Sequence, residues 1–499
     1  MRIGIDFGTC FSLPALQSDD RTVFLLPPGV YGIPSLFYYD EWEGIQTGEA
    51  ANKAGQGTDA VNLKRAVKLS LPSTFTADGK TFTGKQMAAA ILAGVVSQAQ
   101  SIARTKLITE PIDEAVISVP AAFTQAEKRI LREAAETPVK DGGPGIKVIG
   151  FIKEPVAAAL SYFRDSMKDH TRILVYDLGG GTFDIAIVEA DSRLREKYTV
   201  IDSATLRIGG NDWDARIEEY LASMLEKECG FAVSNDPGHM EKIRREANSV
   251  KHAFSENICG AFPQRVRARI EVNGRNHNIP MTSQMFDELT GELFRKTVKE
   301  TKRLLDANKD QPVQDIICVG GSTNMPQVQN GLKSEFPDKN VHFYEPEKAV
   351  ASGAAIYAEY CDGKEPYLTD IAAFSYGTDC YPDFENDPTR RVIINLVRRG
   401  QRLPVSSTDR FRTAVNNQRH MYFDIFETEQ DVREYDYKDR VRPILSAELE
   451  LPAGLAKGTL CKLDMTLNKD GLLEICASYG NDLRSEASLY LYDDNGTHI

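Results

Sequence analysis

The sequence predicts an α/β protein that carries an all-β domain toward its C-terminal end, and three observations lead there. Apolar runs of strand length alternate with helical patterns over the first three quarters of the 499 residues. Beyond about residue 362, polar and apolar residues alternate and helical patterns cease. Segments 3–9 and 174–182 share one form: an apolar strand, then aspartate, glycine and threonine. We therefore expect two related α/β subdomains, a short linker and an all-β domain.

The α/β part contains well-separated signals for both kinds of element. Helices are predicted over 84–107, 124–136 and 240–256, and Thr124 with Glu127 three residues later forms a capping-box pattern. Strands are predicted over 2–6, 114–120, 172–177, 186–190 and 315–321.

The C-terminal part shows the alternation typical of antiparallel strands. A tight turn through Asn468 to Gly471 predicts a hairpin between its two flanking runs. Further strands are predicted within 390–400, 419–428, 447–454, 461–480 and 487–496.

Composition and charge exclude several functional classes. The chain has 59 basic and 72 acidic residues, a formal net charge of -13, and no long block of lysine and arginine, so nucleic acid is not an expected partner. No apolar run approaches the length of a membrane span, and the N-terminal segment lacks a signal-peptide pattern. The eight cysteines form no CxxC pair and the seven histidines no HExxH motif, so we expect reduced thiols, no zinc site and a cytoplasmic location.

The two similar loops combine groups suited to phosphate and to a hard cation. Glycines after a strand allow backbone N–H groups to approach phosphate oxygens, and the threonines add hydroxyl groups. Asp6 and Asp177 would repel phosphate unless a cation lies between them, which predicts Mg²⁺ with a nucleotide. The alternative is a pair of tight turns capped by aspartate.

Two more glycine pairs precede helical patterns, in 207–214 and 319–326. Each could bring backbone N–H groups and a helix N-terminus to an anion, although each alone is equally compatible with an ordinary turn. Together the four loops predict a clamp around one ligand.

The order and spacing of these motifs resemble the actin and sugar-kinase ATPase superfamily, and more closely the heat-shock protein 70 (DnaK-type) chaperones. The resemblance covers about residues 1–360 and is looser in the β-rich part, in 400–418 and 467–478. The matching segments of the first part are IDFGTCFS, NLKRAVKL (62–69), ISVPAAF (117–123), IKEPVAAALSY (152–162), YDLGGGTFDIAIVE (176–189), IGGNDWDAR (208–216), VGGSTNMPQVQ (319–329) and EPEKAVASGAA (345–355).

The resemblance implies a two-lobed actin-like ATPase domain, built from duplicated ribonuclease H-like subdomains, followed by a β-sandwich that binds peptide. The implied limits are an ATPase domain over 1–361 (lobe I about 1–170, lobe II about 171–361, with an inserted subdomain at about 209–290), a linker over 362–370, and a β-sandwich over 371–499 without the family's helical lid.

The resemblance also implies roles for individual residues around ATP or ADP. Asp6 and Asp177 would hold hydrated Mg²⁺, and K⁺ is a further candidate cation. Lys64 matches the catalytic lysine, Glu154 the catalytic glutamate and Asp184 the carboxylate behind the attacking water, although without the motif Lys64 would be read as a surface lysine and Glu154 as the first residue of a helix. Nucleotide contacts would come from Gly8, Thr9, Cys10, Phe11, Gly179, Gly180, Gly181, Thr182, Gly209, Gly210, Lys251, His252, Ser255, Gly320, Gly321, Ser322, Asn324 and Glu347.

The sequence departs from the family pattern at the adenine end of this site. His252 and Asn324 stand where two arginines usually stack on the base, and Asn248 replaces a glutamate. A guanidinium on an aromatic face contributes about 0.5 to 2 kcal/mol, so we expect weaker or less selective adenine binding. Phe11 would compensate in part by packing near the sugar.

The machinery that couples the two domains also differs. Pro120 matches the family's proline switch, but Lys128 takes the place of a relay arginine, and an ammonium cannot make a forked pair of hydrogen bonds. Phe411, Ala414 and Met421 align with the peptide groove, although ordinary core positions explain them equally well. The linker is also less apolar than usual, so we expect weaker coupling.

The sequence thus predicts a divergent chaperone of this type, with slow ATP hydrolysis and binding of unfolded or extended polypeptide segments. J-domain co-chaperones and nucleotide exchange factors are implied partners. One alternative is a nucleotide-binding scaffold that has lost client cycling, and a less favoured one is a small-molecule kinase.

Overall fold

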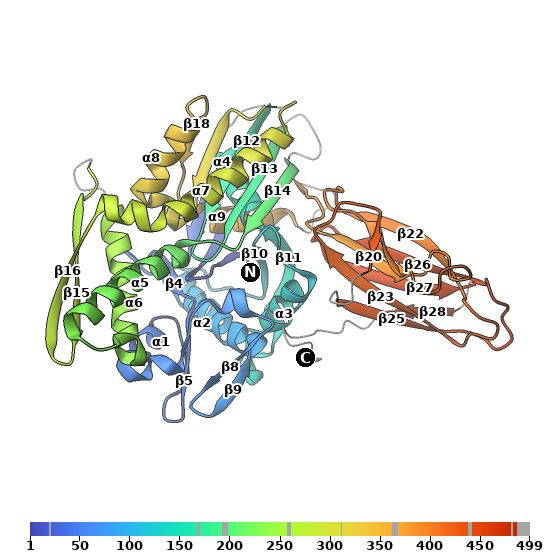
Figure 1. The fold of residues 1–499 in the computed structure, drawn as a ribbon, viewed down its shortest axis with the longest axis horizontal. Helices are drawn as coiled ribbons and strands as arrows, with labels where there is room; N and C mark the ends of the chain where they lie inside the picture. Colours follow the sequence, from blue (N-terminus) through green and yellow to red (C-terminus); the bar gives the residue numbers. More distant parts are fainter. Residues whose placement is uncertain are drawn as a thin grey trace. The chain divides into compact units, whose positions relative to one another are not determined.

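The computed structural model describes residues 1–18, 21–166, 170–191, 198–256, 261–310, 312–361, 368–437, 442–480 and 483–486. These residues form two compact units (Figure 1). The second contains Ala122–Ile130, Thr199–Asp202 and the described residues from Leu368 on, and the first contains the rest. The sequence did not indicate that the two short segments would group with the β-rich part.

The first sheet of the first unit has the strand order β11-β10-β1-β2-β3, with β4 beside β2. β1 pairs in parallel with β10, and β10 with β11, whereas β1, β2 and β3 are antiparallel neighbours. The strands are β1 (Arg2–Phe7), β2 (Phe11–Ser18), β3 (Arg21–Phe24), β4 (Ile33–Pro34), β10 (Glu114–Val119) and β11 (Lys147–Lys153).

The second sheet repeats this plan with the order β18-β17-β12-β13-β14. β12 and β13 are antiparallel, and β12, β17 and β18 are parallel neighbours, as β1, β10 and β11 are in the first sheet. This shared order is the structural counterpart of the repeated loop in the sequence. The strands are β12 (His170–Leu178), β13 (Phe183–Asp191), β14 (Tyr198–Leu206), β17 (Asp315–Val319) and β18 (Asn340–Phe343).

Helices cover these sheets. α9 packs against β1 and β2 and against α4, which explains why nearly every residue of α9 is buried. The α-helices are α1 (Gly48–Ala54), α2 (Gly84–Thr105), α3 (Gln125–Glu136), α4 (Glu154–Ser166), α5 (Gly210–Cys229), α6 (Pro237–Ser255), α7 (Ser283–Ala307), α8 (Pro326–Glu335) and α9 (Ala349–Tyr360).

Small elements complete the first unit. A hairpin of β15 (Arg265–Val272) and β16 (Arg275–Thr282) packs against α6, and α6 packs against α5, so these four elements form one local group (Figure 1). The remaining elements are β5 (Phe37–Asp40), β6 (Gly44–Thr47), β7 (Leu63–Lys64), β8 (Thr74–Ala77), β9 (Lys80–Thr83) and the 3-10 turns η1 (Gly57–Asn62), η2 (Val67–Ser70), η3 (Val139–Asp141), η4 (Val233–Asn235) and η5 (Gly321–Asn324).

The β-rich part of the second unit has two sheets that share one core. Their orders are β24-β21-β20-β23-β25 and β22-β26-β27-β28. The strands of these two sheets are β20 (Ser375–Cys380), β21 (Val392–Val397), β22 (Val405–Arg412), β23 (His420–Thr428), β24 (Glu434–Asp436), β25 (Leu445–Glu450), β26 (Leu460–Leu467), β27 (Leu473–Tyr479) and β28 (Leu483–Glu486). The short strand β19 (Leu368–Thr369) precedes them and belongs to neither sheet.

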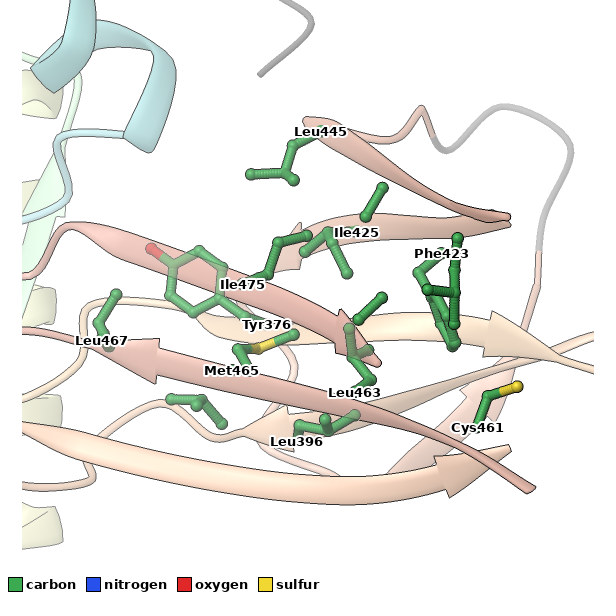
Figure 2. Close-up of a cluster of buried hydrophobic side chains, with 14 of the residues drawn as sticks. Tyr376, Leu396, Phe423, Ile425, Leu445, Cys461, Leu463, Met465, Leu467 and Ile475 are labelled. Carbon is green, nitrogen blue, oxygen red and sulfur yellow. The ribbon is translucent and has the colours of Figure 1, made fainter. Parts of the chain in front are cut away.

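The alternating sequence of β26 accounts for this core. Cys461, Leu463, Met465 and Leu467 are buried while the residues between them are more exposed, as the two-residue period of a strand requires. Figure 2 shows these four side chains among those of the shared core, which also contains Tyr376 of the other sheet. Burying each large apolar side chain contributes about 1.5 to 3 kcal/mol, so the core holds the two sheets together.

Several predicted elements are confirmed. The capping box forms at the start of α3, where the Glu127 carboxylate accepts from the Thr124 N–H at 2.8 Å and the Glu127 N–H donates to Thr124 Oγ1 at 3.2 Å. The hairpin of β26 and β27 turns through Asn468 to Gly471. The strand predicted in 487–496 and most of the 362–370 linker lie outside the described residues. Among the described helices, none has the length and hydropathy of a membrane span.

Candidate active site

The two similar loops, one after β1 and one after β12, meet each other in the first unit. A methyl group placed on Gly181 would lie 2.9 Å from the Thr9 side chain, and one on Gly180 would lie 2.4 Å from Cys10 Sγ. The side chains of Thr9 and Thr182 are both buried. The repeat in the sequence therefore marks two loops that share one site.

The two other glycine loops join them. Asn211 N–H, in the first turn of α5, donates to the Gly180 carbonyl at 2.8 Å, and Ser322 Oγ donates to the Gly179 carbonyl at 2.9 Å. A Cβ at Gly209 would lie 2.4 Å from Gly181 N, so only glycine fits at this position. The structure thus brings all four predicted loops together.

Gly320 is constrained in the same way. Its φ of +85° lies in the left-handed region, and a Cβ there would be 2.5 Å from Asp177 Oδ1. Gly321, beside it, opens the turn that leads through Ser322 toward α8. The backbone therefore passes directly beside the carboxylate of Asp177.

Four carboxylates surround this meeting point. Asp6 Oδ1, at the end of β1, accepts from Ser118 Oγ at 2.9 Å. Asp177 and Asp184 are directly opposite each other in the antiparallel pair of β12 and β13. Glu154 begins α4, and it is buried like Asp177 and Asp184.

Lys68, and not the predicted Lys64, supplies the buried ammonium of this cluster. Its Nζ forms an ion pair with Glu154 Oε1, and only 2% of its side chain is exposed. The ammonium of Lys64 instead lies over the Phe75 ring, 5.9 Å from its centroid. The structure thus places Lys68 beside the carboxylates and Lys64 against Phe75, and the catalytic role of Lys64 stays a prediction.

The local backbone explains why Lys68 reaches inward. Lys64 ends β7, whose partner strand β5 aligns Phe37 with it. Ala66 then adopts a left-handed conformation, with φ of 53°, and the 3-10 turn η2 follows. This reversal turns the second lysine of the segment toward the carboxylates.

The carboxylates strongly perturb one another. Burial, and then the charge of Glu154, raises the pKa of Asp6 to about 6, although Lys68 and Ser118 oppose the shift. Burial and Glu154 likewise raise the pKa of Asp184 to about 6, against hydrogen bonds from Thr205 and the Ala121 N–H. The pKa of Asp177 is raised by burial and by the charges of its neighbours. The single charge of the Lys68 ammonium does not neutralise these four carboxylates, so the cluster favours a further cation.

The residues present fit a magnesium–nucleotide group. Asp184 Oδ1 accepts from the Ala121 N–H at 2.7 Å and from Thr205 Oγ1 at 2.6 Å, whereas its Oδ2 is buried and has no hydrogen-bond partner in the described structure. A buried oxygen without a donor favours a water or a cation beside it. Mg²⁺ is typically held by one or two carboxylates, several waters and phosphate oxygens, which matches Asp6 and Asp177 beside the glycine loops.

The residues assigned to adenosine lie mainly on α6. Lys251 Nζ donates to the Gly210 carbonyl at 2.9 Å and pairs with Asp214 at 2.7 Å. Asn248 donates to the same Asp214 carboxylate at 3.0 Å, and Ser255 Oγ bonds back to the Lys251 carbonyl. These contacts hold the Lys251 ammonium against the loop and first turn of α5.

Four other predicted contacts are less enclosed. His252 and Glu347 are exposed, and Asn324 is half-buried at the end of η5. Phe11 exposes 50% of its surface at the start of β2. The predicted compensation by Phe11 stays a prediction.

The motifs and this geometry agree with a comparison against protein families. The sequence model of the family described as "Hsp70 protein" matches residues 56–485, which is most of the chain. The chain belongs to the Hsp70 family. Hsp70 proteins are ATPases that bind ATP or ADP with Mg²⁺ and generally bind unfolded peptides and co-chaperones.

The structure gives the surroundings of the two residues that the coupling prediction singled out. Pro120 is buried directly after β10. Within the second unit, Lys128 Nζ donates to the carbonyls of Asp470 and Gly471, each at 3.2 Å. Lys128 in this Hsp70 protein therefore binds the turn between β26 and β27.

The three positions aligned with a peptide groove are half-buried. Phe411 and Met421 pack against the core of the β-rich part, and the Phe411 ring contacts the Phe423 ring edge-on, with centroids 5.4 Å apart. The Ala414 N–H donates to Gln418 Oε1 at 2.8 Å. These contacts agree with the core interpretation, and the groove role stays a prediction.

Sequence reasoning missed several residues of the site. Lys68 had one available signal, since it is the only charge in the apolar run 67–71. Ser118 and Arg65 had none, because their partners Asp6 and Glu241 are 112 and 176 residues away. Arg65 pairs with Glu241 at 2.5 Å and so connects this segment to α6.

Proposed function

We propose that this Hsp70 protein binds ATP with Mg²⁺ and hydrolyses the γ-phosphate in its first unit. The observation that carries the proposal is the meeting of four glycine loops around a group of carboxylates, one of which, Glu154, forms an ion pair with Lys68. The same group of loops would suit no apolar ligand, because its lining is backbone, hydroxyl and carboxylate.

Each part of the site has a role in this proposal. Asp6 and Asp177 would hold Mg²⁺, and the backbone of Gly8, Thr9 and Gly179–Thr182 would hold the phosphates. When bound, Mg²⁺ neutralises charge on the phosphate oxygens. K⁺ as a second cation rests on the family resemblance alone.

The remaining polar groups act on the attacking water. Lys68 neutralises developing charge near the γ-phosphate, and Glu154 and Asp184 position the water for in-line attack. The free Oδ2 of Asp184 is the acceptor available to that water. Glu154 is held in place by its ion pair with Lys68.

We further propose that the β-rich part binds extended segments of unfolded polypeptide, as the family does in general. Family membership supports this half of the proposal, and Phe411, Ala414 and Met421 are its candidate contacts. J-domain co-chaperones, exchange factors and a cytoplasmic location are proposed on the same grounds.

Weak coupling between peptide binding and hydrolysis completes the proposal. Lys128 offers a single ammonium to two carbonyl groups, whereas a guanidinium would present a rigid fork of donors. We expect Lys128→Arg to increase the effect of peptide on turnover, with Lys140→Arg, an exposed lysine in η3, as the matched control. No change in the Lys128 variant would contradict this part.

One experiment separates the functional alternatives. ATP turnover by the wild-type protein is measured with and without an unfolded peptide, and nucleotide and peptide binding are measured by calorimetry. Hydrolysis together with peptide binding supports the chaperone proposal. Binding of nucleotide without turnover would favour a scaffold, and phosphate transfer to a metabolite would favour a kinase.

A further inference from the structure

A cysteine, a histidine and a glutamate form a linear group at the end of α5, in a part of the first unit that the ATPase proposal does not use. Cys229 Sγ lies 3.6 Å from His277 Nε2. On the other side of the ring, His277 Nδ1 lies 2.7 Å from Glu228 Oε2. The arrangement is therefore thiol, imidazole and carboxylate in series.

The fold fixes the three side chains at different depths. Cys229 is the last residue of α5, and Gly230 ends the helix with a left-handed φ of 78°. His277 lies in the middle of β16, opposite Ile270 of β15. The imidazole is 4% exposed and the Glu228 carboxylate 47% exposed, while Cys229 is half-buried. A small reagent can thus reach the thiol, while packing holds the ring behind it.

This order of groups has a defined chemical consequence. A carboxylate on Nδ1 holds that nitrogen as the donor, which leaves Nε2 facing the sulfur as the proton acceptor. Transfer of the thiol proton to Nε2 gives a thiolate beside an imidazolium, and the carboxylate stabilises the imidazolium. The helix C-terminus at Cys229 acts in the opposite direction, because its partial negative charge disfavours a thiolate. Reactivity at this position therefore depends on His277.

We propose that Cys229 is a reactive thiol, a site of oxidative modification by hydrogen peroxide or a similar small peroxide. The thiolate attacks one peroxide oxygen and the O–O bond breaks. The departing hydroxide takes the proton from His277 Nε2 and leaves as water. Sulfur is oxidised by two electrons to sulfenic acid, the peroxide is reduced, and the imidazole returns to its neutral form.

Other thiols of the chain provide internal references. Cys318, Cys361 and Cys461 are buried. Cys380 is half-buried like Cys229, but burial and the charge of Asp379 raise the pKa of its thiol to about 11. Cys380 is therefore a reference for a thiol of similar exposure that is held protonated, and the variants below test the activation by His277.

The test measures sulfenic acid at each cysteine. The whole protein is treated with limiting hydrogen peroxide at neutral pH, trapped with dimedone and mapped by mass spectrometry. We expect Cys229 to react at least about 10-fold faster than Cys380, because Cys229 faces a proton acceptor and the raised pKa of Cys380 keeps that thiol protonated at neutral pH. Equal rates at the two positions would overturn the proposal.

Two variants test the mechanism, and both are compared by circular dichroism and ATP binding with the wild type. His277→Gln should lower the Cys229 rate about 10-fold and leave the Cys380 rate unchanged. Glu228→Gln, at a position open to solvent, should lower the Cys229 rate several-fold without loss of fold. If Glu228→Gln folds normally and the rate is unchanged, the carboxylate has no such role and the proposal fails.

Discussion

Replacement of Lys68 by methionine tests the most specific departure from the sequence prediction. Methionine keeps the length and apolar stem of the side chain and removes the charge. The matched control is Lys64→Met, which removes the lysine that the motif indicated. The two lysines are four residues apart and the substitution is the same, so a difference between the variants reports on where the lysine lies.

The expected magnitudes follow from the surroundings of each lysine. Lys68 pairs with buried Glu154 and is 2% exposed, and although burial alone would lower its pKa, Glu154 and Asp6 outweigh that effect and raise it. Loss of one preorganised group that stabilises transition-state charge typically lowers kcat by about 10²- to 10³-fold. Lys64 contributes a half-exposed contact with the Phe75 ring, worth about 0.5 to 1 kcal/mol of stability, and its removal should leave kcat within about twofold.

The assay is single-turnover hydrolysis of ATP with saturating Mg²⁺, with ADP binding measured separately by calorimetry. We expect Lys68→Met to bind ADP and to hydrolyse ATP about 10²- to 10³-fold more slowly than the wild type. Normal hydrolysis by Lys68→Met together with a large loss in Lys64→Met would refute the reasoning and restore the prediction from the motif.

Three further predictions concern pH, packing and the base. Burial raises the pKa of Glu427 to about 7, above its ordinary 4.5, so the folded protein binds the proton more tightly and its stability should fall as pH rises from about 5 to 8. Thermal unfolding of the wild type should show a loss of roughly 1 to 3 kcal/mol of unfolding free energy over this range, and Glu427→Gln should remove most of that loss. An equal dependence on pH in both proteins would contradict the prediction. Gly209→Ala places a Cβ 2.4 Å from the second loop and should weaken ATP binding at least about 10-fold by calorimetry, whereas Gly291→Ala, in α7 beside a flexible arginine, should leave binding unchanged. His252→Arg with Asn324→Arg should tighten ATP over GTP by about 2- to 30-fold in the same assay, and unchanged selectivity would mean that neither position meets the base.

The sequence predicted the elements and the loops well, because they depend on local patterns. Apolar alternation produced the strands of the β-rich part, and the repeated aspartate, glycine and threonine marked both loops that meet at Thr9 and Gly181. The capping box at Thr124 formed as its spacing required. Each of these features is set by residues a few positions apart.

The sequence could not predict features that depend on backbone reversals or distant partners. The choice between Lys64 and Lys68 depends on a left-handed φ at Ala66, and an alanine gives no signal for that conformation. His277 and Cys229 are 48 residues apart on a strand and a helix, so their contact depends on how the hairpin packs. The grouping of Ala122–Ile130 with the β-rich part is likewise a tertiary property.

Hydrolysis of ATP with and without Mg²⁺, by the wild type and by Asp177→Asn, tests the central claim most directly. The account predicts that wild-type turnover requires Mg²⁺ and that the variant hydrolyses ATP at least about 10²-fold more slowly. The unfolding temperature of the variant should stay close to that of the wild type. Wild-type turnover that is equally fast in EDTA, or a fully active Asp177→Asn protein, would contradict a magnesium–nucleotide site between the two loops.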